Sequence, residues 1–142
     1  MISGARAQSS AALVDQQGMS SGLASSPRAY RQSAVLTATP GQLVVLLYDG
    51  VHRFLKQAAI ATRSGDIAIS HNKLRRAEMI ISHLRETLDM EQGEVAERLR
   101  AIYNHCTRQL GEARFNRDAD AIEQVDKLLG ELREAWAQAA RT

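Results

Sequence analysis

Several features that would narrow the function are missing from this sequence of 142 residues. Its single cysteine, Cys106, excludes an intrachain disulfide framework and fits a reducing compartment. Aromatic residues make up only 4%, too few for a platform on which nucleic-acid bases would stack. No apolar run approaches the ~20 residues of a membrane-spanning helix. The N-terminus also lacks the compact apolar stretch behind basic residues that would predict a secretory signal. We therefore expect a cytoplasmic protein without membrane insertion.

The chain also lacks a large excess of charge of one sign. The 18 Lys and Arg face 16 Asp and Glu, a formal net charge of +2. Such a balance produces no field that attracts nucleic acid, so a nucleic-acid-binding bundle is disfavoured. The strongest basic cluster is "KLRRAE", Lys73 to Glu78. It could contact phosphate, but the acidic residues that follow favour a solvated helix face.

The residue patterns of catalytic and metal sites are absent. No Glu-x-x-His pair of the kind that holds di-iron occurs, so the four histidines are read as solvated or near helix caps. Cys106 lies on an apolar stripe, which predicts a buried thiol rather than a nucleophile. Neither a Walker-type run nor G-x-G-x-x-G is present. We expect a non-enzymatic interaction protein with no cofactor and no metal, rather than a small bundle enzyme or a metal carrier.

Residues 1–28 differ in composition from the rest of the chain. They are rich in Ser, Gly, Ala and Gln, with few large apolar residues. Such a segment buries too little surface to offset its ordering entropy, which predicts a disordered leader. Met19 is an alternative start, so the native product begins either at Met1 or at Met19. The domain organisation expected is a leader over residues 1–28 and a helical domain over residues 29–142.

Four helical segments are expected after the leader. The first begins at Thr39-Pro40, an N-cap followed by proline at the first helical position, and ends at Ser64-Gly65. Breaks follow at "DMEQGE" and "NRDAD", with Asp66 and Asp118 as candidate caps. The apolar positions at helical spacing are Leu43, Leu47, Val51, Phe54 and Ala58; Ile67, Leu74, Ala77, Ile81, Leu84 and Leu88; Val95, Leu99, Ile102, Cys106, Leu110 and Ala113; and Ile122, Val125, Leu129, Leu132, Trp136 and Ala139. Similar lengths and short turns predict an all-α, antiparallel, up-down-up-down four-helix bundle.

The first helical segment has more apolar surface than a core requires. Val44, Tyr48 and Leu55 form a second stripe beside the first, and Ile80 and Tyr103 broaden the faces of later helices. Part of this surplus is expected to form a groove for a partner helix. The alternative is that all of it is core.

The stretch from Tyr30 to Ala58 contains a specific motif. It supplies Tyr30, Val35, Thr37-Ala38, Pro40, Leu43, Leu47-Tyr48-Asp49-Gly50 and Phe54-Leu55. This pattern resembles the signature of the flagellar secretion chaperones, FliS. The similarity continues through "MIISHLRETLDME" and "LLGELREAW", so it covers about residues 29–137.

The resemblance implies a function. Members of that family are four-helix bundles without enzymatic activity. They bind the C-terminal segment of flagellin in the cytoplasm, prevent premature polymerisation and deliver the subunit to the type III export apparatus. Contact with components of the export gate is also implied. The alternative is a generic helical adaptor with a different partner, and the oligomeric state is open between monomer and weak homodimer.

The resemblance also selects residues. The candidate flagellin-binding residues are Tyr30, Val35, Leu43, Leu47, Tyr48, Asp49 and Gly50, and Tyr103 is added from the apolar surplus. In the family, the segment before the first helix can occupy a flagellin groove. Tyr30, Val35 and Leu36 are therefore expected to act as a movable apolar strap that covers the groove when flagellin is absent.

Overall fold

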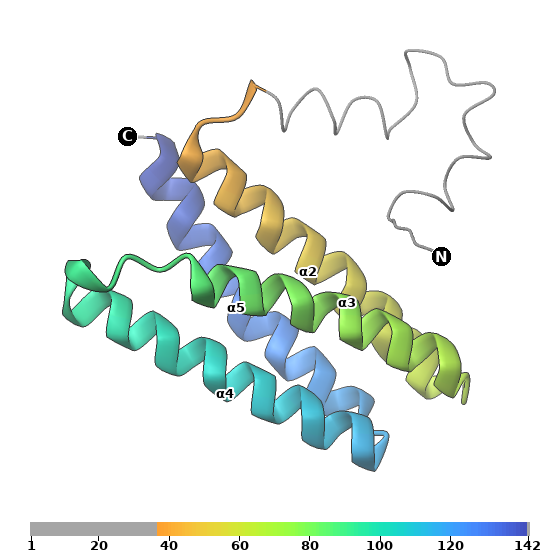
Figure 1. The fold of residues 1–142 in the computed structure, drawn as a ribbon. Helices are drawn as coiled ribbons and strands as arrows, with labels where there is room; N and C mark the ends of the chain where they lie inside the picture. Colours follow the sequence, from red (N-terminus) through yellow and green to blue (C-terminus); the bar gives the residue numbers. More distant parts are fainter. Residues whose placement is uncertain (1–36, 142) are drawn as a thin grey trace, which may run out of the picture. The chain divides into compact units, whose positions relative to one another are not determined.

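The computed structural model describes residues 37–141, in which helices follow one another without a strand. The elements are α2 (Pro40–Arg63), α3 (Ile67–Glu86), a 3₁₀ turn η2 (Met90–Gln92), α4 (Glu94–Asn116) and α5 (Ala119–Arg141) (Figure 1). The residues from Thr39 onward form one unit. The expected boundary at residue 28 and the strap residues Tyr30, Val35 and Leu36 lie outside the described residues.

The four long helices form an antiparallel bundle (Figure 1). Helix α2 packs against α3 and α5, and α4 packs against the same two helices. Short connections force each helix to run back along the one before it. The all-α fold class predicted from the sequence is confirmed.

The helices begin where the sequence predicted. The Thr39 hydroxyl accepts a hydrogen bond from the Gln42 N–H, and the Gln42 side chain accepts one from the Thr39 N–H, which completes a capping box. Asp66 caps α3 by accepting from Ile69 N–H at 3.3 Å. Asp118 caps α5 by accepting from Ala121 N–H at 3.0 Å. Each cap satisfies a backbone donor that has no partner within its helix.

The connections between helices use left-handed backbone conformations. Gly65 has φ +76° after α2, and Gly93 has φ +70° before α4. Glycine adopts these values without a steric penalty from Cβ. After α4 the same conformation falls on Arg117, with φ 53°. Among the connections within residues 37–141, this is the one whose residue type does not suit its backbone.

The buried residues of α2 differ from the stripe that the sequence predicted to face the core. Tyr48, Val51, Leu55 and Ala58 are buried, whereas Leu47 and Phe54 are half-buried and Leu43 is 36% exposed. The inner face of α2 therefore combines residues from both predicted stripes, and the remaining stripe residues flank it: Leu43, Val44, Leu47 and Phe54. The other helices contribute these buried residues: Leu74, Ala77, Ile81, Leu84, Tyr103, Cys106, Leu110, Ala113, Ile122, Val125 and Leu129.

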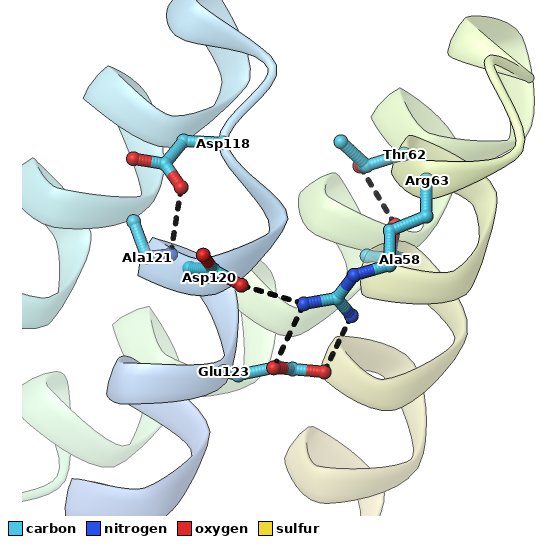
Figure 2. Close-up of polar contacts among 7 residues, drawn as sticks. All are labelled: Ala58, Thr62, Arg63, Asp118, Asp120, Ala121 and Glu123. Carbon is cyan, nitrogen blue, oxygen red and sulfur yellow. Dashed lines mark hydrogen bonds and ion pairs between the residues drawn. The ribbon is translucent and has the colours of Figure 1, made fainter.

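The C-terminal end of α2 is tied to the start of α5 by Arg63 (Figure 2). Its guanidinium donates to Glu123 at 2.6 Å and to Asp120 at 2.7 Å. Hydrogen bonds from the guanidinium lower the pKa of Glu123, and the two carboxylates raise the pKa of Arg63. Because the groups are exposed, water screens the attraction, and the cluster sets register more than it stabilises.

Gly111 provides a stability test in the middle of α4. No atom lies within 4 Å of where a Cβ would be built. Gly111→Ala is expected to raise the free energy of unfolding by about 0.5–1 kcal/mol, since alanine loses less backbone entropy in a helix. Urea denaturation followed by circular dichroism measures the change. A decrease would show that α4 is not a regular, open helix at this position.

Candidate functional site

A buried aromatic cluster links three helices of the bundle. The hydroxyls of Tyr48 on α2 and Tyr103 on α4 lie 2.5 Å apart and share a hydrogen bond. Both rings are almost fully buried, at 2% and 1% exposure. Trp136 on α5 lies beside both hydroxyls and lowers the pKa of each. A buried hydroxyl without a partner would be costly, so the three side chains fix the spacing of their helices.

The pKa values of this cluster keep its groups neutral. Burial, reinforced by the hydrogen bond with Tyr103, raises the pKa of Tyr48 well above its usual range. Burial likewise raises the pKa of Tyr103, and it raises the pKa of the Cys106 thiol to about 11. The thiol is therefore protonated near neutral pH, which disfavours a nucleophilic role. These groups act in packing and hydrogen bonding.

The raised pKa values predict alkaline destabilisation. In the unfolded chain, cysteine ionises near pH ~8.5 and tyrosine near ~10, whereas the folded groups hold their protons more tightly. Their contribution is complete below those unfolded values and is lost as the pH rises toward the folded ones. For each group, the free energy of unfolding is expected to fall by up to ~1.4 kcal/mol for each pH unit above the pKa of the unfolded chain. Urea denaturation at pH 8 and pH 10.5 measures this; an unchanged midpoint would contradict the burial of all three groups.

An apolar cavity of about 410 Å³ lies beside the aromatic cluster. It sits where α2 begins, α3 ends, α4 begins and α5 ends. Its lining residues are Val44, Leu84, Thr87, Leu88, Asp89, Gln92, Val95, Ala96, Leu99, Tyr103 and Trp136. Val95 is 63% exposed, so the cavity has an apolar residue accessible from solvent. A pocket of this size with mainly apolar walls suits the apolar side chains of a partner.

A second cleft, of about 260 Å³, lies between α2 and α5; we call it the polar cleft because six of its eight lining residues carry polar side chains. Arg133 Nε donates to Asp49 Oδ1 at 2.9 Å, and His52 Nδ1 lies 2.8 Å from Asp126 Oδ1. Asp49 is thus held by a partner within the bundle. Nowhere in residues 37–141 do three His, Cys, Asp or Glu side chains gather as metal ligands would. Over the same residues, no helix is long and apolar enough to cross a membrane.

The structure brings only some of the predicted site residues together. Tyr103 lines the apolar cavity, while Tyr48 and Asp49 line the polar cleft. Gly50 is buried against α3, where an added Cβ would lie 3.3 Å from Ile80 Cδ1. Leu43 and Leu47 lie on the flank of α2 rather than in either pocket.

Sequence reasoning placed most cavity residues in the core and did not single them out. Leu84, Leu88, Leu99 and Trp136 appeared only as core positions of their helices, and Val95 as the first of its stripe. The available signal was position. Leu84 and Leu88 lie at and just after the end of α3, Val95 and Leu99 lie in the first turns of α4, and Trp136 lies near the end of α5. Short connections already implied that these parts of the helices meet at one end of the bundle.

Comparison with known proteins gives a consistent result. Residues 23–142 match the sequence model of the family described as flagellar protein FliS. The flagellar secretion chaperone FliS of Salmonella typhimurium is 39% identical over 121 residues, 81% of this chain and 90% of the relative. The protein of the same name from Bacillus subtilis is 33% identical over 80% of this chain and 85% of its own length. The flagellar secretion chaperone FliSB of Pseudomonas aeruginosa is 33% identical over 74% of this chain and 84% of its own length. The resemblance found in the Tyr30–Ala58 motif is confirmed.

Proposed function

Because the chain belongs to the FliS family of flagellar proteins, we propose that it is a non-enzymatic export chaperone for flagellin. It binds the C-terminal segment of flagellin in the cytoplasm, prevents premature polymerisation and delivers the subunit to the type III export apparatus, where components of the export gate are further partners. The observation that carries this proposal is the apolar cavity at the open end of the bundle.

The cavity gives the chaperone a way to hold a disordered segment. Such a segment loses conformational entropy when it folds on binding, so it needs a large apolar contact to compensate. Each large apolar side chain that it buries contributes about 1.5–3 kcal/mol. Leu88, Val95 and Leu99 offer walls for these side chains, and the Tyr48–Tyr103 pair keeps the helices around them in place.

The predicted binding residues divide into two roles under this proposal. Tyr103 forms part of the cavity wall, and Leu43 and Leu47 extend the apolar surface along the flank of α2. Tyr48, Asp49 and Gly50 support the site from within, through Tyr103, Arg133 and Ile80, respectively.

The strap remains part of the proposal. Tyr30, Val35 and Leu36 cover apolar surface in the free protein and are displaced by flagellin. The seven residues from Tyr30 to Leu36 are joined by six Cα–Cα steps, which span at most ~22 Å when fully extended. Val44 of the cavity follows Leu36 by only eight residues, so cavity residues on α2 are close along the chain.

Deleting Met1–Leu36 is expected to leave the bundle folded and to increase self-association. Within residues 37–141 the core comes from α2, α3, α4 and α5, so the deletion variant keeps every one of these core residues. Exposed apolar surface would then promote association between copies. Circular dichroism tests the fold, and light scattering over a concentration series tests association. Unchanged scattering would contradict the strap.

Co-purification tests the proposed function. The full chain should retain the C-terminal segment of flagellin from its own host, and flagellin that lacks this segment should be lost in the wash. Failure to retain the segment would contradict the proposal and favour an adaptor with a different partner.

A further inference from the structure

A group of cations surrounds one aromatic ring on the face shared by α2 and α3. Phe54 on α2 is half-buried. The Arg53 guanidinium lies 5.4 Å from the centre of its ring, Lys73 Nζ lies 5.7 Å away and the Arg76 guanidinium lies 5.8 Å away. All three distances are within the ~6 Å range of cation–π attraction. We call these four residues the Phe54 cluster.

Within the part of the chain that the structure describes, no carboxylate pairs with these three cations. None of the ion pairs formed within residues 37–141 involves Arg53, Lys73 or Arg76. The nearest acidic residues along the chain are already engaged, since Glu78 pairs with Arg114 at 2.7 Å and Asp49 with Arg133 at 2.9 Å. The acidic residue that seemed to balance "KLRRAE" is therefore directed to α4. Three like charges held near one ring repel each other, and an incoming anion would relieve that repulsion.

Apolar residues lie near the cluster on the same two helices. Leu47 and Ile80 are partly buried and pack against the core, and Gly50 brings the two helices close together beside Ile80. Met79, nearly one helical turn after Arg76, is 66% exposed. Figure 1 shows α2 and α3 side by side. A partner on this face meets cations and apolar side chains together.

We propose that the Phe54 cluster docks an acidic segment of a partner protein, one that carries apolar side chains between its carboxylates. Charge complementarity selects acidic groups, and the apolar surroundings select a peptide rather than a nucleic-acid backbone. Nucleic acid is further disfavoured because its binding rests on many phosphate contacts, whereas this cluster has three cations. None of the four residues lines the apolar cavity, although the surface around them shares Leu47 with the proposed flagellin site.

The test uses the full chain and a fluorescein-labelled peptide of repeated Glu-Glu-Leu. Fluorescence anisotropy should show saturable binding of the peptide to the wild type. In Arg76→Glu the affinity should fall about ten-fold or more, because the substitution removes an attractive charge and replaces it with a repulsive one. Arg75→Glu is the matched control, because it makes the same change of charge on the same helix. Arg75 is exposed and is not among the cations at the ring, so its variant should bind within about three-fold of the wild type.

Further measurements distinguish an acidic-peptide surface from a nucleic-acid site and from an extension of the flagellin site. Arg76→Glu should keep the wild-type circular dichroism spectrum and should still retain the flagellin C-terminal segment. Absence of peptide binding, equal weakening by Arg75→Glu, or equal binding of a Glu-Glu-Ser peptide would overturn the proposal. Tighter binding of a single-stranded DNA oligonucleotide, lost in Arg76→Glu, would assign the cluster to nucleic acid instead. Loss of flagellin retention in Arg76→Glu would make the cluster part of the flagellin site.

Discussion

Val95→Asp is expected to weaken binding of the flagellin C-terminal segment by about 100-fold, because a carboxylate at the cavity would have to be desolvated without a partner. Val95 lines the cavity but is 63% exposed, so the bundle loses little packing. It also lies in the first turn of α4, where a negative charge favours the helix. Isothermal titration calorimetry with the segment measures the change in affinity.

Ile60→Asp is the matched control for Val95→Asp. Ile60 is 58% exposed and lies outside the cavity, near the end of α2. The same apolar-to-acidic change there should leave the affinity for the flagellin segment within about three-fold of the wild-type value. Equal loss in both variants would show that added negative charge, rather than the cavity, determines binding. Wild-type affinity in Val95→Asp would place the flagellin site elsewhere.

Tyr48→Asp is expected to unfold the bundle. Tyr48 is 2% exposed and lies against Tyr103 and Trp136, so aspartate would place a carboxylate among apolar groups and leave the Tyr103 hydroxyl without its partner. The combined cost of the cavity and the polar group exceeds ~4 kcal/mol, a large part of the stability of a domain this size. Circular dichroism should show lost helicity at 25 °C. A native spectrum and melting temperature would show that Tyr48 is more accessible than the structure indicates.

The conservative changes isolate the hydrogen bond. Tyr48→Phe and Tyr103→Phe should each lower the free energy of unfolding by about 1–3 kcal/mol, since each leaves one buried hydroxyl with a missing partner. The double variant should lose less than the sum of the two, because the shared bond can be lost only once. Additive losses in urea denaturation would show that the two hydroxyls do not interact.

Local chemistry made the helices predictable. Helix starts are marked by Thr39, Asp66 and Asp118, whose side chains accept hydrogen bonds from backbone N–H groups of the first turn. Pro40 has no N–H that would need a partner. Both effects are local, so they can be read without knowing the rest of the fold. Gly65 marks an end for an equally local reason, its positive φ. Arg117 adopts that conformation without any residue-type signal, so the last connection was located by its polar composition alone.

The site depended on distances that helical periodicity does not encode. Tyr48 and Tyr103 were both part of the apolar surplus predicted from the sequence, and only packing shows that their hydroxyls meet across the bundle. Two stripes on α2 competed for the core, and the contacts with α3 and α5 decided which residues became its flank. The charge pattern "KLRRAE" appeared balanced until Glu78 was seen to pair with Arg114. Each of these outcomes depends on side-chain pairing between helices.

Methyl-resolved NMR during titration with the flagellin C-terminal segment tests most directly whether the apolar cavity is the flagellin site. We expect the methyl signals of Leu88, Val95 and Leu99, which line the cavity, to shift and saturate together, while those of Ile60 and Ile69, exposed outside it, stay in place. Shifts confined to Ile60 and Ile69, with the cavity methyl signals unchanged, would contradict this assignment.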